Sequence, residues 1–181
     1  LIESYPQFPM KVVNGGLRPH NNETINTMSD FLKEHWEAVY ERTGQPFSYN
    51  ILSNKEMVYD TDPGARAVVV MRKMNPIREF EFFKRVQAAF YSENMDITKM
   101  KILLTIAEEF ELDVNEFESL FLSEEMKFET KSDFQLAANL GVTGFPALIL
   151  KVSGEFFMIA KGYTDINTVA RTIDNILENR V

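Results

Sequence analysis

The chain has 181 residues, of which 45% are hydrophobic and 25% are charged, proportions typical of one globular domain or of one domain that carries an insertion. Its formal net charge is −8, from 19 basic and 27 acidic residues, which disfavours nucleic acid as a partner because phosphate binding needs a basic face. No apolar run approaches the ~20 residues of a membrane-spanning helix, and the absence of cysteine excludes a disulfide, a thiolate metal site and a cysteine nucleophile within these residues.

The first residues indicate the end of a helix followed by a short strand. Leu1, Ile2 and Tyr5 have helical spacing, so we expect the chain to begin inside a helix and other residues to precede it. Residues 10–14, Met-Lys-Val-Val-Asn, indicate a short strand, which Gly15 and Gly16 would end.

A block of helices is predicted next. Apolar residues that recur every three or four positions predict an amphipathic helix from residue 25 to residue 43, ended by Gly44. Residues 45–60 are irregular in pattern, with room for a short strand near residues 49–52. Later helix starts are marked by capping residues, two of them followed by proline: Asp62–Pro63, Asn75–Pro76, Asp96, Asp113 and Ser123.

The fifteen phenylalanines mostly fall on the apolar faces of these helices. Packing in the core is the expected role of such residues. On this interpretation Phe31, Val39, Phe80 and Phe83 point inward.

The last third of the chain predicts a β-hairpin and a final helix. Two apolar runs, residues 146–152 and 155–160, flank the two-residue turn Ser-Gly, a spacing typical of a hairpin. Pro146 stands at the mouth of the first run, and proline is tolerated there because the first residue of a strand need not donate a ladder hydrogen bond. Residues 166–177 have one apolar face and predict the terminal helix.

This order of elements resembles the thioredoxin fold, and the turn V-x-G-F-P at residues 142–146 resembles the loop that opens the hairpin of that fold. The predicted fold class is therefore α/β, thioredoxin-like, with a helical insertion of the DsbA type. The stretches that resemble the FrnE-like branch of the DsbA family, predicted protein-disulfide isomerases, are VVNGGLRP (12–19), DPGARAV (62–68), AFYSENMDIT (89–98), DFQLAANLGVTGFPALIL (133–150) and KGY (161–163). The resemblance predicts a thioredoxin part at residues 1–19 and 134–181 and an inserted helical domain at residues 20–133.

The resemblance also implies a cis Phe145–Pro146 bond and a ledge on which an extended substrate peptide pairs with the protein backbone. It assigns substrate binding to the residues of this loop, Thr143, Gly144, Phe145 and Pro146. It places near the same end of the sheet Gly15, Gly16, Leu17, Arg18, Gly162 and Tyr163. For the GGLRP stretch, a loop that ends a strand and caps the helical insertion is an equally good interpretation.

The chain departs from the family at its reactive centre. The family uses a C-x-x-C at the start of its first helix, and no catalytic residue is assigned here because the chain has no cysteine. We expect the cysteine pair and its strand upstream of Leu1, in a segment of roughly 20–25 residues. That strand would lie between residues 10–14 and 146–152, and its absence would leave backbone groups unpaired at about 1–3 kcal/mol each.

Three functions are compatible with these residues. The first is a thiol–disulfide oxidoreductase or isomerase that acts on protein or peptide disulfides, an enzyme if the upstream segment carries the cysteines. The second is a redox-inactive thioredoxin-fold module that binds a peptide or a partner protein. The third is a glutathione-using relative of the kappa-type transferases, which the G-F-P form of the loop disfavours.

No metal or other cofactor is expected, and neither nucleic acid nor a membrane is expected as a partner. Acidic clusters, such as that at residues 108–111, have the pattern of solvated helix faces. His20 and His35 are not spaced as a pair of metal ligands. Cytoplasm is the default localisation, and the oligomeric state, the substrate and the redox direction are left open by the sequence.

Overall fold

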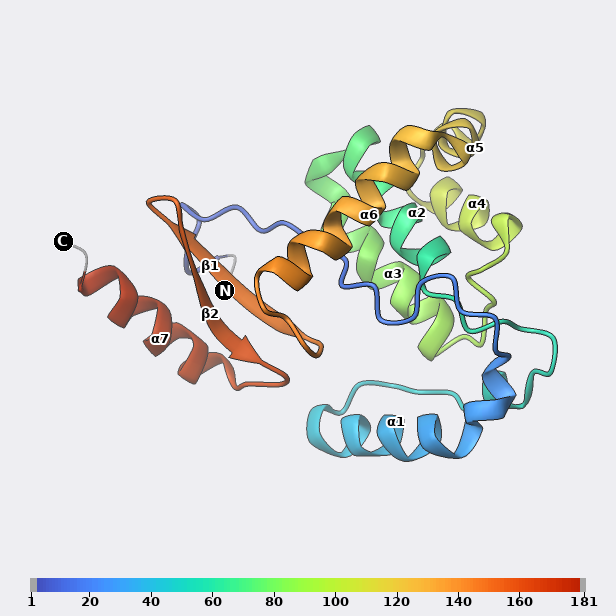
Figure 1. The fold of residues 1–181 in the computed structure, drawn as a ribbon, viewed down its shortest axis with the longest axis horizontal. Helices are drawn as coiled ribbons and strands as arrows, with labels where there is room; N and C mark the ends of the chain where they lie inside the picture. Colours follow the sequence, from blue (N-terminus) through green and yellow to red (C-terminus); the bar gives the residue numbers. More distant parts are fainter. Residues whose placement is uncertain (1–2, 180–181) are drawn as a thin grey trace. The chain divides into compact units, whose positions relative to one another are not determined.

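The computed structural model describes residues 3–179 and has two compact units, residues 1–15 with 133–181 and residues 16–132 (Figure 1). The first unit holds the hairpin and the last helix, and the second holds most of the other helices. The chain thus passes between the units after Gly15 and again after Ser132, whereas the sequence places these boundaries after residues 19 and 133.

The sheet of the described residues is a two-stranded hairpin, β1 (Ala147–Val152) and β2 (Glu155–Lys161). The strands are antiparallel, in a register that runs from Ala147 opposite Lys161 to Val152 opposite Glu155, with a bulge after Leu148. The turn between them has Ser153 at φ 51° and Gly154 at φ 86°. Two successive positive φ values define the turn type that matches the twist of a hairpin, and the predicted hairpin is confirmed.

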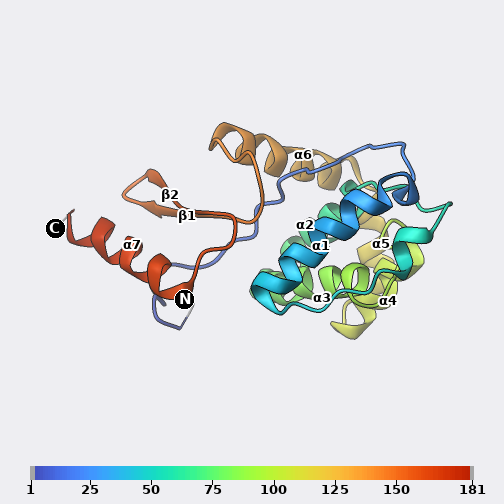
Figure 2. The same cartoon turned by 90° about the horizontal axis from the view of Figure 1, so that it is seen from below.

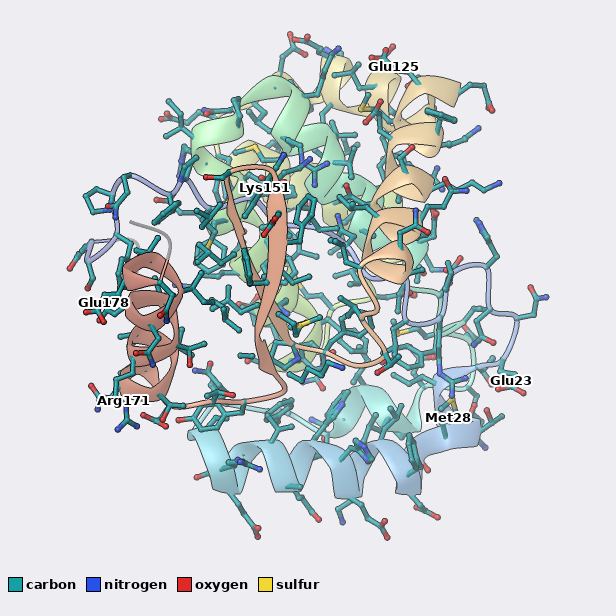
Figure 3. All side chains as sticks on the ribbon, turned by 60° about the vertical axis from the view of Figure 1, so that its left-hand side comes forward. Glu23, Met28, Glu125, Lys151, Arg171 and Glu178 are labelled. Carbon is teal, nitrogen blue, oxygen red and sulfur yellow. The ribbon has the colours of Figure 1, made fainter. Side chains whose placement is uncertain are left out.

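Helix α7 (Ile166–Glu178) packs along this hairpin and closes the small core of the first unit (Figures 1 and 2). The buried side chains of this core are Leu150, Ile159, Val169 and Ile173. In Figure 3, Arg171 and Glu178 project from the opposite side of α7, where both are exposed. The helix is therefore amphipathic, as its sequence pattern predicts.

The predicted strand at residues 10–14 is wrong, because these residues have no regular secondary structure. A strand requires a ladder of hydrogen bonds with a neighbour, and the amide of Asn14 instead donates to the carboxylate of Asp133. The helical end expected from Leu1, Ile2 and Tyr5 lies partly outside the described residues. From residue 3 to residue 8 the chain forms turns, and Tyr5 is fixed to α7 by a hydroxyl hydrogen bond of 2.8 Å to Asp174.

The second unit consists of helices joined by irregular connections, with one isolated β-bridge between Thr24 and Val58. Its elements are η1 (Ile25–Met28), α1 (Ser29–Thr43), η2 (Asn50–Ser53), α2 (Asp62–Met74), η3 (Pro76–Arg78), α3 (Glu79–Tyr91), α4 (Met100–Glu109), α5 (Val114–Leu122) and the first part of α6 (Glu124–Asn139). The short strand considered near residues 49–52 is wrong, since a turn of 3-10 helix occupies this position. Among the described residues, no helix has the length and the apolar character needed to cross a membrane.

Most helix starts lie where the capping residues predict them. The Asp113 carboxylate accepts hydrogen bonds from the amides of Asn115 and Glu116 at 2.9 and 3.1 Å. The Ser123 hydroxyl accepts one from the amide of Met126 at 3.2 Å. These bonds satisfy amides that the first turn of a helix leaves without partners.

Asp96 does not cap α4, which begins four residues later at Met100. Its carboxylate accepts hydrogen bonds from the amide and the hydroxyl of Thr98. The side chain of Asp96 thus stabilises a turn ahead of the helix, an alternative open to aspartate because it can bond the backbone two residues on.

The helical unit is packed around two groups of aromatic rings. Trp36 is buried, with its ring centroid 5.5 Å from that of Phe47 and 5.2 Å from that of Tyr91. Phe82 is completely buried, with its ring 5.1 Å from Phe110 and 6.0 Å from Phe117. Several side chains assigned to the core by periodicity are instead exposed, which corrects the predicted faces: Phe31, Val39 and Phe80.

Burial of Tyr59, together with its contact to Tyr91, raises the pKa of the Tyr59 hydroxyl well above its usual value of 10.0. The folded state therefore holds the hydroxyl proton of Tyr59 more tightly than the unfolded state does. The contribution of protonated Tyr59 to the free energy of unfolding is fully present below pH 10. We expect the free energy of unfolding to fall as the pH rises above 10. Urea unfolding followed by Trp36 fluorescence measures this slope, and Tyr59→Phe should reduce it; an unchanged slope would contradict the assignment.

Candidate functional site

The loop between α6 and β1 is an exposed part of the first unit that the sequence singles out. The chain leaves α6 through Gly141, whose φ is 72° and whose amide donates to the carbonyl of Ala138 at 3.0 Å. The next amide, of Val142, donates to the carbonyl of Ala137 at 3.1 Å. These bonds close the helix end, and the four residues that follow, residues 143–146, are all exposed.

The Phe145–Pro146 peptide bond is cis, the geometry implied by the resemblance. The carbonyl oxygen of Pro146 accepts a hydrogen bond of 2.7 Å from the amide of Gly162, which extends the hairpin by one pair beyond β1 and β2. Gly162 has φ 73°, a value that favours glycine, and the chain bends away there before Tyr163. The loop that begins β1 and the bend that ends β2 are thus fastened to each other.

Phe145 packs against the backbone of Gly15, although the two residues are far apart in the sequence. A Cβ atom added to Gly15 would lie 1.8 Å from Cε1 and 1.9 Å from Cζ of the Phe145 ring. The ring therefore occupies the space that any other residue at position 15 would need. About half of Phe145 remains open to solvent, at 46% exposure.

Asn14 and Asp133 form a buried polar pair next to this contact. The backbone amide and the side-chain Nδ2 of Asn14 both donate to Oδ2 of Asp133, at 3.1 and 3.0 Å. The exposed fractions of the two residues are 8% and 4%. A carboxylate that accepts two hydrogen bonds fixes the residue that precedes Gly15, and with it the position of the Gly15 backbone.

Gly16, Leu17 and Arg18 belong to the helical unit. Arg18 is bound there to Thr61, through its amide to the threonine hydroxyl at 3.0 Å and through its carbonyl to the threonine amide at 3.2 Å. The structure therefore brings together Phe145 with Gly15, and Pro146 with Gly162. The GGLRP stretch is thus divided, with Gly15 against Phe145 in the first unit and the residues from Gly16 onward in the helical unit.

Sequence reasoning did not identify Asn14 and Asp133 as members of this site. Asn14 was expected to end a strand, and Asp133 lies inside a predicted helix. The one signal in the sequence is the position of Asp133, three residues after Thr130 and four before Ala137, both of which are buried on the same face of α6. A charged residue on an apolar face indicates a partner but does not reveal which one.

The described residues offer no group of three or more histidine, aspartate or glutamate side chains arranged to hold a metal ion. The sequence has no cysteine. What the structure shows at this site is the exposed backbone of a loop, the half-exposed ring of Phe145 and a turn held by the bond from Gly162 to Pro146.

A helical insertion, a proline loop in cis and a C-terminal hairpin with its helix define a thioredoxin fold of the DsbA type. Residues 76–163 match the family model described as Thioredoxin. A solved structure of a putative protein disulfide isomerase from Nitrosomonas europaea is 30% identical, covers 99% of this chain and is itself covered to 87%, with a TM-score of 0.88. The chain belongs to this family of DsbA-type thioredoxin-fold proteins.

Two other relatives are more distant. The cytosolic disulfide reductase DsbM from Pseudomonas aeruginosa has the same fold, at 20% identity and a TM-score of 0.78, over 93% of this chain and 84% of DsbM. The ClpXP adapter protein SpxH from Bacillus licheniformis is 26% identical over 137 residues, 69% of this chain. The matched region spans 45% of the length of SpxH, so that relative is much longer than the part it shares.

Proposed function

We propose that this chain carries the substrate-docking part of a thiol–disulfide oxidoreductase or isomerase that acts on protein or peptide disulfides. Its substrate-binding residues would be Thr143, Gly144, Phe145 and Pro146. The reactive C-x-x-C would lie in sequence upstream of Leu1, and a cytoplasmic location remains the prediction.

One observation carries this proposal. Among the residues that the structure describes, the backbone amide and carbonyl of Phe145 have no hydrogen-bond partner, and the whole loop of residues 143–146 is exposed. Free backbone groups beside a sheet are the feature to which an extended peptide adds as a further strand. The membership of the chain in a family that includes a putative protein disulfide isomerase supports a peptide with cysteines as the ligand.

Phe145→Ala should weaken the binding of an unfolded polypeptide, because the exposed ring offers apolar area beside the free backbone. We expect a loss of about 5- to 30-fold in affinity, the size typical of an aromatic anchor. The probe is reduced and carboxymethylated lysozyme, and titration calorimetry with the protein expressed from its full gene measures the dissociation constant.

Phe156→Ala is the matched control. Phe156 has nearly the same exposed fraction, 49%, but lies beside the turn at the other end of the hairpin. If both variants lose affinity equally, or neither does, the loop of residues 143–146 is not the docking site.

A second candidate function is a redox-inactive module that binds a partner protein through the same loop. The absence of cysteine and the similarity to an adapter protein favour it. A count of free thiols in the reduced product of the full gene separates the two candidates. Two titratable thiols would support the oxidoreductase, and none would leave the binding module.

A further inference from the structure

We propose that Gly15 is a positioning residue for the docking loop, because the absence of a Cβ atom at this position leaves the space that the Phe145 ring occupies. This inference rests on the proposed function for its consequence in binding. The contact itself can be tested without that function. Nothing in the sequence assigns this role to Gly15 beyond its place near the same end of the sheet.

The reason for glycine at position 15 is close approach and not backbone conformation. The glycines at positions 16, 44, 141, 154 and 162 have positive φ values, and Gly15 does not. A Cβ atom at position 15 would lie 1.8, 1.9 and 2.9 Å from three carbon atoms of the Phe145 ring. Carbon atoms in van der Waals contact stand about 3.5–4.0 Å apart. Alanine therefore suits the backbone at position 15 but not the ring above it.

Both sides of this contact are held by their neighbours. On one side, Asn14 is tied by two hydrogen bonds to the buried carboxylate of Asp133. On the other side, Pro146 is tied to Gly162 by a hydrogen bond of 2.7 Å. The two backbones therefore keep their separation, and an added methyl group must be accommodated by movement of the ring.

The atoms that a methyl group would meet are at the far end of the Phe145 side chain, which can rotate away. We therefore expect Gly15→Ala to keep the fold and to displace the ring. A ring held in its binding position loses less conformational freedom when a peptide binds. Displacement should consequently weaken peptide binding by about 3- to 10-fold, a loss no larger than that expected from removal of the ring itself.

The experiment compares Gly15→Ala with Gly144→Ala in protein that carries ring-labelled phenylalanine. Gly144 lies beside Phe145, has no positive φ, and a Cβ atom added there would meet nothing within 4 Å. The Phe145 ring resonance, assigned by its loss in Phe145→Ala, should shift in Gly15→Ala and stay in place in Gly144→Ala. An unshifted resonance in Gly15→Ala would overturn the proposal.

A double-mutant cycle links the contact to binding of carboxymethylated lysozyme. Gly15→Ala should weaken the affinity of the native chain and have no further effect in a Phe145→Ala background, because the two residues act through one contact. An equal loss in both backgrounds would overturn the positioning role. If Phe145→Ala binds as tightly as the native chain, the proposed function fails, while the ring resonance still decides the contact.

If Gly15→Ala does not fold, the double variant that combines it with Phe145→Ala still tests the contact. Removal of the Phe145 ring opens the space that the added methyl group needs. Recovery of the folded spectrum in the double variant would support the contact, and failure to recover would overturn it.

Discussion

Phe82→Ala is expected to lower the free energy of unfolding of the helical unit by about 3–5 kcal/mol, the range for removal of a buried phenylalanine ring. Phe82 is completely buried on α3, between Phe110 after α4 and Phe117 of α5. Alanine would leave a cavity where three elements meet, and the packed helices can close it only in part. Urea unfolding followed by the fluorescence of Trp36, the one tryptophan of the chain, measures the loss.

Phe128→Ala is the control for this variant, because it makes the same chemical change on α6 at a side chain that is 68% exposed. Its effect should stay within about 0.5 kcal/mol. A loss for Phe82→Ala no larger than that of the control would mean that the Phe82 ring does not contribute to the core as the structure indicates.

The sequence predicts the starts of α5 and α6 because local hydrogen bonds mark them. Asp113 and Ser123 cap through amides two or three residues away, so residue type and spacing are sufficient evidence. The hairpin is predicted for the same reason, since its turn type follows from two adjacent residues, Ser153 and Gly154.

The inward faces of the helices are predicted less well, because neighbouring helices decide them. In α1 the buried residues are Leu32 and Trp36, and Phe31 lies one position away on an exposed face. In α3, phenylalanine occupies positions 80, 82 and 83, so two adjacent faces are apolar in the sequence and the packing of Phe82 selects one. Periodicity identifies such a helix but leaves its rotation about its own axis open.

The site shows the same division between local and distant causes. The exposed loop at Pro146 is predicted by a five-residue pattern and a resemblance. The contact of Gly15 with Phe145 and the bonds of Asn14 to Asp133 join residues more than a hundred positions apart. No local pattern encodes these contacts, because they exist only once the chain has brought α6 beside residues 14 and 15.

Asp133→Ala should have the second largest effect on stability, because it leaves two buried donors of Asn14 without an acceptor. An unsatisfied buried donor costs about 1–3 kcal/mol, so we expect a loss of about 2–4 kcal/mol in the hairpin unit. The amide signals of β1 in a urea series monitor this unit directly. Because Asn14 precedes Gly15, the variant should also shift the Phe145 ring resonance.

Two further variants separate the carboxylate from the helix that carries it. Asp133→Asn keeps an oxygen that can accept the same bonds, so its loss should be smaller than that of alanine. Glu129→Ala removes an exposed carboxylate from the same helix and should change stability by no more than about 0.5 kcal/mol. Equal losses for alanine at positions 129 and 133 would contradict the bonding role. If Asp133→Ala loses stability but the Phe145 ring resonance does not shift, the contact between Gly15 and Phe145 does not depend on the bonds between Asn14 and Asp133.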